Sequence, residues 1–313
     1  MKKKGERRME YLYLLAARVF GAARGYSMKR ASGIAPGAKN SLVINLIRSL
    51  ICLAVSIPVF LFSESLPRGI SAIALALISG IFSLLQMFFW VIAVGYVSIS
   101  AIEVFTMIGT VALPLLLSPI LYEGESVSLL HWLGAALLLA AAILMSSDKK
   151  SEKRITPMGI ILALLSAIGA SGAAISQKLY SYHVIEKGDG GIAFFNLIGF
   201  AVAAAAFAIA LAALLIPAIR NNAGEGKRSN ALTDFPYKAS LGFIAFAALS
   251  LYAYQYFMTK ASSMTSAVFY PLSYALGFLG GFALDTFFFG VKATCPRMLS
   301  ALIVLISIIL ITI

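Results

Sequence analysis

Residues 69–94 read GISAIALALISGIFSLLQMFFWVIAV, a run of 26 residues without a Lys, Arg, Asp or Glu. As an α-helix, the run would extend about 39 Å at about 1.5 Å per residue, which exceeds the hydrocarbon thickness of a bilayer, about 30 Å. A surface helix of a soluble protein would need a polar or charged face toward water. This run has no charged face, so it predicts a helix that crosses a membrane.

The rest of the chain repeats this pattern. Apolar residues make up 60% of the 313 residues and charged residues 12%, whereas about 25% are charged in an ordinary soluble domain. The charges gather in short segments between apolar stretches, and no connection is long enough to hold a soluble domain. We predict an all-α polytopic membrane protein with about ten transmembrane helices, at 10–28, 41–62, 69–94, 98–121, 129–146, 157–182, 190–219, 236–259, 263–289 and 296–313.

The span 10–28 differs from the others because it contains two charges, Arg18 and Arg24. A charge in the middle of a bilayer is costly, about 2.5–3.5 kcal/mol on insertion scales. Residues typical of a membrane interface nevertheless flank this span: Tyr11, Tyr13, Tyr26, Lys29 and Arg30. We predict that it crosses the membrane. If it lay on the surface instead, the two chain ends would be on opposite sides.

Short matches between the two halves indicate an internal duplication. Asn45-Leu46-Ile47 recurs as Asn196-Leu197-Ile198, Ser100-Ala101 matches Ser266-Ala267, and the same shift pairs Gly124 with Gly290. The charged segment 148–156 divides the ten spans into five and five. We therefore predict an N-terminal five-helix repeat over 1–147, a connecting loop over 148–156 and a C-terminal five-helix repeat over 157–313. Because five is odd, the two repeats must be inverted in the membrane.

One stretch carries a family resemblance. Leu121-Tyr122-Glu123-Gly124-Glu125-Ser126 is followed by Leu130-His131-Trp132-Leu133-Gly134 and an apolar helix. This stretch resembles the Gly-Glu loop and Trp-Leu-Gly helix start of the drug/metabolite transporter superfamily, in its EamA-like ten-helix branch. Asn45 to Arg48 resembles the basic position of that family's second helix. The second half departs from the pattern, since Val291 follows Gly290 where the family often has Glu.

The resemblance implies two inverted five-helix repeats around a central cavity, and transport by alternating access. It also implies that both termini are inside the cell. The positive-inside rule weakly favours the reverse, because eight loop and tail Lys and Arg lie on the side of the termini and thirteen on the opposite side. We follow the resemblance, because the basic N-terminal tail is the most concentrated block of charge.

Enzyme signatures are absent from the sequence. The chain has two histidines, His131 and His183, and two cysteines, Cys52 and Cys295, none at the spacing of a metal site or a catalytic triad. We expect no catalysis, no cofactor and no metal. The net charge of +12 lies mostly in loops and tails, where lipid headgroups and not nucleic acid are the expected partner.

Charged residues within the spans are the first candidates for a transport site. Arg18 and Arg48 are expected to face a wet cavity or a partner group. Since Arg18 and Arg24 are six residues apart, they cannot both point into one pore, and Arg24 is expected to extend toward the interface. Glu103 is the acid deepest in the first half and a candidate for proton coupling. The alternative is that Glu103 forms a structural ion pair with Arg48 or Arg18.

Amide and tyrosine side chains form the second group of candidates. On the helix 236–259, Tyr252, Gln255 and Tyr256 share one face with Thr259, a surface suited to an organic substrate with flat apolar parts. The proposed substrate-binding set is completed by four further residues: Gln86, Gln177, Asn196 and Tyr270.

These features predict a secondary carrier for a small organic metabolite. An anionic substrate is favoured because intramembrane Arg outnumbers acid. The alternative is a flippase for a lipid or lipid-linked molecule with the same fold, and an intramembrane enzyme is less favoured. We expect a small-molecule substrate and the lipid bilayer as partners, a monomer or a homodimer, and a multi-pass location in a bacterial-type plasma membrane.

Overall fold

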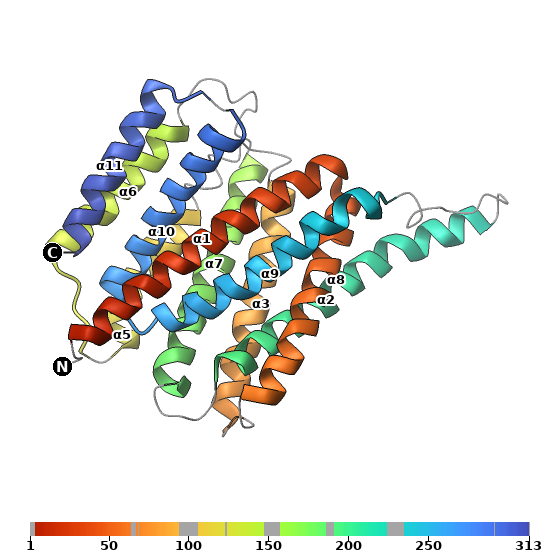
Figure 1. Cartoon of the computed structure of the whole chain (residues 1–313), viewed down its shortest axis with the longest axis horizontal. Helices are drawn as coiled ribbons and strands as arrows, with labels where there is room; N and C mark the ends of the chain where they lie inside the picture. Colours follow the sequence, from red (N-terminus) through yellow and green to blue (C-terminus); the bar gives the residue numbers. More distant parts are fainter. Residues whose placement is uncertain are drawn as a thin grey trace.

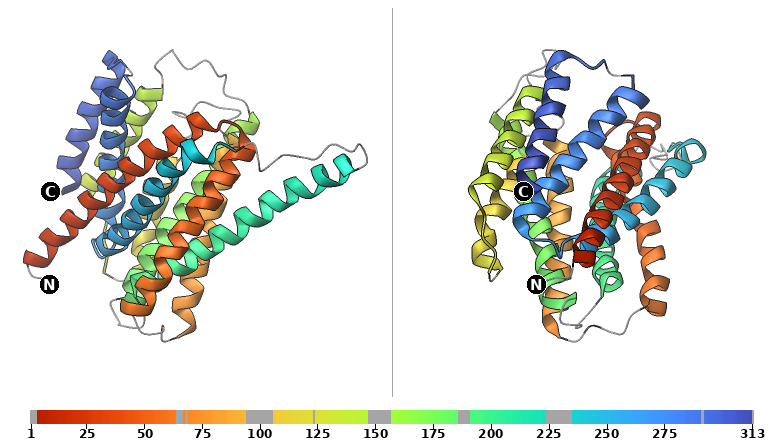
Figure 2. Two further views of the ribbon diagram at one scale, coloured as in Figure 1. Left: turned by 45° about the vertical axis from the view of Figure 1, so that its right-hand side comes forward. Right: turned by 60° about the vertical axis from the view of Figure 1, so that its left-hand side comes forward.

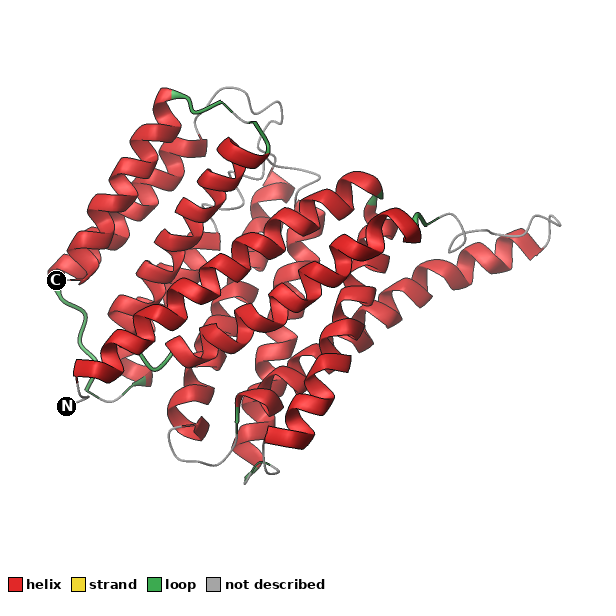
Figure 3. Cartoon of the chain, in the orientation of Figure 1, coloured by secondary structure: helices red, strands yellow, loops and turns green. Residues whose placement is uncertain are grey.

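The computed structural model describes residues 4–63, 67, 69–93, 106–122, 124–146, 157–185, 191–223, 235–290 and 292–312. This part of the chain consists of helices joined by loops and has no strand (Figure 3). The first half contains α1 (Lys4–Ile34), α2 (Ala38–Ser63), α3 (Ile70–Ala93), the π-helical segment η1 (Ile108–Ala112), α5 (Leu113–Leu121) and α6 (Leu129–Ser146). The second half contains α7 (Pro157–Tyr180), the π-helical segment η2 (Ser181–Ile185), α8 (Ile192–Ala223), α9 (Tyr237–Ala261), α10 (Ser266–Ala283), the π-helical segment η3 (Leu284–Phe288) and α11 (Cys295–Thr312).

The predicted fold class is confirmed. Every predicted span coincides with a helix except 98–121, whose first part lies outside the described residues. Seven of the described helices are long and apolar enough to cross a membrane, and two shorter apolar helices cover Gly109–Leu121 and Leu129–Leu144. In lipid, a helix satisfies its own backbone hydrogen bonds, and this explains why apolar runs of this length all adopt the same structure.

Helix α1 is longer than its predicted span at both ends. It is not one of the seven apolar helices, because Arg18 and Arg24 lie in its middle. It nevertheless belongs to the bundle, since it runs beside α9 and also contacts α10 (Figure 1). With α1 in this position, the N- and C-terminal ends lie at the same end of the bundle (Figure 2).

The helices pair in a pattern that relates the two halves. Helix α1 packs on α9 as α7 packs on α3, and α2 contacts α9 as α8 contacts α3. Helix α1 also contacts α10, and α7 contacts η1 and α5. Three further pairings join equivalent helices of the two halves: α2 with α8, α6 with α11 and α5 with α10. These contacts between the two halves therefore have counterparts when the first five helices are exchanged with the last five.

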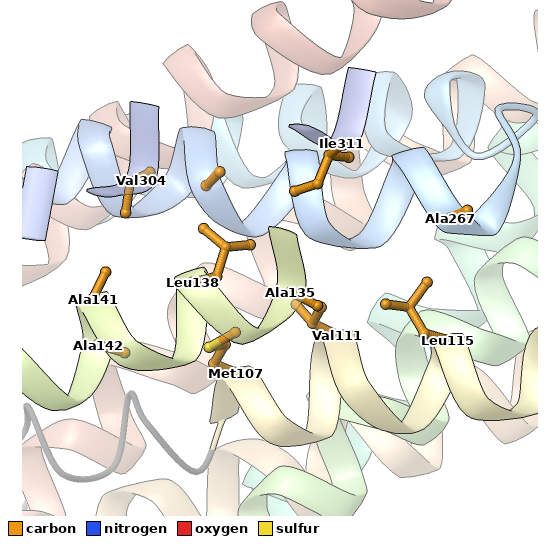
Figure 4. Packing of buried hydrophobic residues seen from close by; sticks show 11 residues of the cluster. Met107, Val111, Leu115, Ala135, Leu138, Ala141, Ala142, Ala267, Val304 and Ile311 are labelled. Carbon is orange, nitrogen blue, oxygen red and sulfur yellow. The ribbon is translucent and has the colours of Figure 1, made fainter. Parts of the chain in front are cut away.

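A tightly packed apolar cluster joins the last helices of the two halves. Its buried side chains come from the fourth and fifth helices of each half, among them Met107, Leu138 and Val304 (Figure 4). Gly134, the glycine of the Trp-Leu-Gly motif, allows Ile311 to approach α6, and the Ser307 hydroxyl donates a hydrogen bond to the Gly134 carbonyl at 2.7 Å. The motif glycine thus serves helix packing.

A second close approach joins α3 and α7 near the middle of the molecule. A Cβ atom at Gly169 would overlap the backbone of Gln86, and one at Gly172 would overlap the ring of Phe82. The hydroxyl of Ser166 donates to the Gln86 carbonyl at 3.1 Å. Small residues on α7 therefore let the two helix backbones come together, as is common in membrane helix pairs.

Replacing Gly169 with alanine is expected to lower the thermal unfolding midpoint in detergent, because the added methyl group would overlap the α3 backbone. Overpacking of this kind costs about 1–3 kcal/mol. Gly199→Ala is the matched control, since a Cβ at this helical glycine of α8 would have no atom within 4 Å. Equal midpoints for the two variants would contradict the close approach of α3 and α7.

Candidate functional site

Two arginines of α1 converge on one tyrosine of α9. The guanidinium carbons of Arg18 and Arg24 lie 5.6 Å and 4.8 Å from the centroid of the Tyr254 ring. Gly21, midway between them, allows the ring to approach the α1 backbone, because a Cβ there would lie 3.2 Å from a ring carbon. Cation–π contacts of this kind are stronger away from water.

The prediction that Arg24 extends toward the interface is therefore wrong. It assumed that two side chains six residues apart diverge, which is correct for their Cα–Cβ directions. The long side chains of Arg18 and Arg24 both reach the Tyr254 ring, so their charged groups lie near the same aromatic side chain. Arg18 also donates a hydrogen bond to the hydroxyl of Ser273 on α10.

A third arginine lies nearby on α2. The side chain of Arg48 is only 6% exposed, and its Nη2 donates to the sulfur of Met87 at 3.5 Å. Arg24 is close enough for the two positive charges to interact. The Nε groups of Arg18 and Arg48 are buried and have no hydrogen-bond acceptor within the described part of the chain. We call Arg18, Arg24, Arg48 and Tyr254 the arginine cluster.

The amide and hydroxyl candidates form a network between α7 and α9. The Gln177 amide donates to Gln255 Oε1 at 3.2 Å and to Thr259 Oγ1 at 2.9 Å. On α10, the hydroxyl of Tyr270 lies 3.4 Å from that of Tyr122. The contact between Tyr122 and Tyr270 joins the two halves of the chain, whereas the Gln177 contacts lie within the second half.

The other predicted residues occupy separate positions. Asn196 is buried, and its Nδ2 has no acceptor among the described residues. Gln86 lies at the α3–α7 contact, whereas Tyr252 packs against Phe200 at a centroid distance of 6.2 Å. Tyr256 faces the ammonium of Lys260 at 5.0 Å. Glu103 lies outside the described residues.

The most complete set of contacts around a buried charge belongs to Lys178, which was not among the predicted site residues. Its ammonium lies 3.0 Å from the Glu125 carboxylate and donates to the carbonyls of Ser262 and Met264. The same ammonium lies 4.8 Å from the centroid of the Tyr122 ring.

Glu125 makes a second contact, with the start of α10. Its Oε2 accepts the backbone N–H of Ser266 at 2.9 Å, at the positive end of the helix dipole. Lys178, Glu125 and the turn 262–266 thus join α5, α7, α9 and α10 at the end of the bundle where the chain termini lie. We call these groups the Lys178 cluster.

The two halves differ at this position. Gly124 and Gly290 follow the fourth helix of each half, and both have a positive φ, 78° and 65°, which glycine adopts without strain. Glu125 follows the first glycine and Val291 the second. The predicted pairing of the two glycines therefore corresponds to a shared turn, but only the first turn supplies a carboxylate.

Comparison with known proteins agrees with this architecture. Residues 8–147 match the EamA-like transporter family. A solved structure described only as the crystal structure of a protein superposes with a TM-score of 0.72, covering 97% of this chain and 96% of that chain at 15% sequence identity. That likeness concerns the fold alone. No curated protein matches the chain.

The family match covers the Gly124-Glu125 loop and the Trp-Leu-Gly helix start on which the resemblance rested. Residues 8–147 are thus similar to the EamA-like transporter family, and the apolar helices make the chain an integral multi-pass membrane protein.

Proposed function

We propose that this protein is a secondary carrier that moves a small organic anion across the membrane by alternating access. The observation that carries the proposal is the arginine cluster. Arg18 and Arg48 have no acidic partner among the described residues, although a charge at membrane depth normally faces a partner or a wet cavity. A carboxylate or phosphate group of a substrate would supply the missing negative charge and accept the free N–H groups.

The surroundings of the cluster support an organic substrate over an inorganic ion. Tyr254 offers an aromatic surface, and the next residue in the chain, Gln255, offers an amide group that is hydrogen-bonded to Gln177. A few polar groups on an otherwise apolar wall are typical of sites for small organic molecules.

The pairing of helices supports alternating access. We propose the division into repeats at 1–147 and 157–313, because the contacts of α1 and α2 with the second half correspond to those of α7 and α8 with the first half. Two inverted repeats can exchange conformations, so that the site opens first to one side and then to the other. The Lys178 cluster would hold one end closed in the state seen here.

Arg48→Gln is expected to lower the initial rate of anion uptake at least tenfold in proteoliposomes, with Arg48→Lys intermediate. The reason is the loss of a charge-assisted hydrogen bond, about 1.5–3 kcal/mol. The measurement uses a panel of radiolabelled carboxylates and phosphate esters. Arg8→Gln, an exposed arginine on the same helix as Arg18, is the control and should behave as wild type.

Two substitutions of Tyr254 distinguish the role of its ring from that of its hydroxyl in the same assay. Tyr254→Phe keeps the cation–π surface and should retain uptake, whereas Tyr254→Leu should lose it. If neutral solutes are carried and Arg48→Gln equals wild type, the anion carrier is excluded. Translocation of a labelled lipid without uptake of any solute would favour a flippase instead.

Proton coupling through Glu103 remains our proposal for the driving ion. With an inward pH gradient imposed on the same vesicles, wild-type uptake should rise, and Glu103→Gln should abolish the rise while leaving exchange of substrate across the membrane. If uptake by the Glu103→Gln variant rises with the pH gradient as in wild type, the coupling proton is not carried by Glu103.

Glu125→Gln is expected to open the terminus-side end of the bundle more often, because the amide cannot pair with the Lys178 charge. We would measure maleimide labelling of Ser262→Cys, a buried position, in a Cys295→Ser background. Labelling should rise several-fold with Glu125→Gln. Glu10→Gln is the control, because its amide oxygen can still accept the Ser263 hydroxyl, which lies 2.8 Å from the Glu10 carboxylate. Equal labelling in all three proteins would refute this role of the Lys178 cluster.

A further inference from the structure

An apolar groove lies on the outside of the bundle, between the end of α1 and the beginning of α9. Its volume is about 380 Å³. The residues that line the groove include Tyr26, Ser27, Lys238, Gly242, Phe243 and Phe246. The groove stays open because no atom lies within 4 Å of where a Cβ of Gly242 would be.

The groove begins at the edge of the membrane. Lys238 is exposed in the first turn of α9, and the apolar span of this helix, Tyr237–Ala261, starts one residue earlier. Phe246, 53% exposed, lies two turns deeper on the same helix. The groove thus runs from the level of the lipid headgroups into the hydrocarbon.

Further positive charge gathers at its mouth. The guanidinium carbon of Arg30 lies 5.4 Å from the ring centroid of Tyr26, which lines the groove, and 5.7 Å from that of Phe289. The ammonium of Lys29 lies 3.8 Å from the Phe289 ring centroid. Both basic side chains are exposed, and the Arg30 guanidinium over a ring keeps N–H groups for other acceptors.

Aromatic rings fix this mouth at the interface. Tyr26 contacts Phe288 and Phe289 at centroid distances of 5.8 Å and 5.6 Å, and Phe288 is 62% exposed. Exposed aromatic rings beside Lys and Arg are typical of the headgroup level of a bilayer.

We propose that this groove is a binding site for an anionic phospholipid. The phosphate group would lie between Lys238 and Arg30, and one acyl chain would occupy the groove along Gly242 and Phe246. The charges select an anionic headgroup, and the apolar wall selects a lipid over a free phosphate ion. The inference does not depend on which solute the protein carries.

The test is native mass spectrometry of the detergent-purified protein with phosphatidylglycerol and phosphatidylcholine of identical acyl chains. Phosphatidylglycerol should bind at least tenfold more tightly. Because one Lys or Arg at an anionic lipid contributes about fivefold in affinity, Lys238→Gln combined with Arg30→Gln should weaken phosphatidylglycerol about 25-fold and leave phosphatidylcholine unchanged. Lys260→Gln, at the other end of α9, is the control for loss of one positive charge.

A second variant tests the groove without changing charge. Gly242→Leu should weaken the binding of both lipids, because the side chain fills the groove. Gly281→Leu on α10 is the control, since a Cβ there also has no atom within 4 Å, and it should leave the binding of both lipids unchanged. Equal binding of the two lipids to the wild-type protein, or no effect of Gly242→Leu, would overturn the site. Displacement of the lipid by inorganic phosphate would overturn it in favour of a simple anion site.

Discussion

A peptide group inside the hydrocarbon has no water to bond with, so the backbone must satisfy its own hydrogen bonds there. Helices meet this requirement, and the described part of the chain is built from them. The departures from regular helix lie in the fourth helix of each half and at the end of α7. Pro114, which has no N–H to donate, lies two residues after the π-helical segment Ile108–Ala112, where Gly109 packs against the α7 backbone. In this segment, irregular backbone is thus placed against a neighbouring helix.

Charge is subject to the same constraint, and the protein meets it in two ways. Lys178 is surrounded by a carboxylate, two carbonyls and an aromatic ring, so its positive charge is compensated within the structure. Arg18 and Arg48 have a ring, a hydroxyl and a thioether but no acid among the described residues. The first arrangement stabilises one conformation, whereas the second leaves a need for negative charge that a substrate would meet.

Much of the architecture could be predicted because it depends on properties that add up along the chain. The length of the apolar runs predicted the helices, and the motif at residues 121–134 indicated the similarity to EamA-like transporters that the family model finds over residues 8–147. The site was less predictable, since its members meet through tertiary contacts. Tyr254 lies in an aromatic stretch from which helical spacing predicted its neighbours Tyr252 and Gln255 as site residues. That spacing could not reveal that Tyr254 faces two arginines of another helix. The one signal in the sequence was Gly21, which lies midway between Arg18 and Arg24 and leaves room for the ring.

The sequence by itself determined that the chain crosses a membrane many times and which few charges are placed in the hydrocarbon, because hydrophobicity and helix length are local quantities. Only the tertiary structure decided which of those charges are compensated. Lys178 and Glu125 are 53 positions apart, and the turn that completes their surroundings is more than 80 positions further along the chain. Contacts over such separations follow from helix packing, in which small residues such as Gly21 and Gly169 decide how near two helices come.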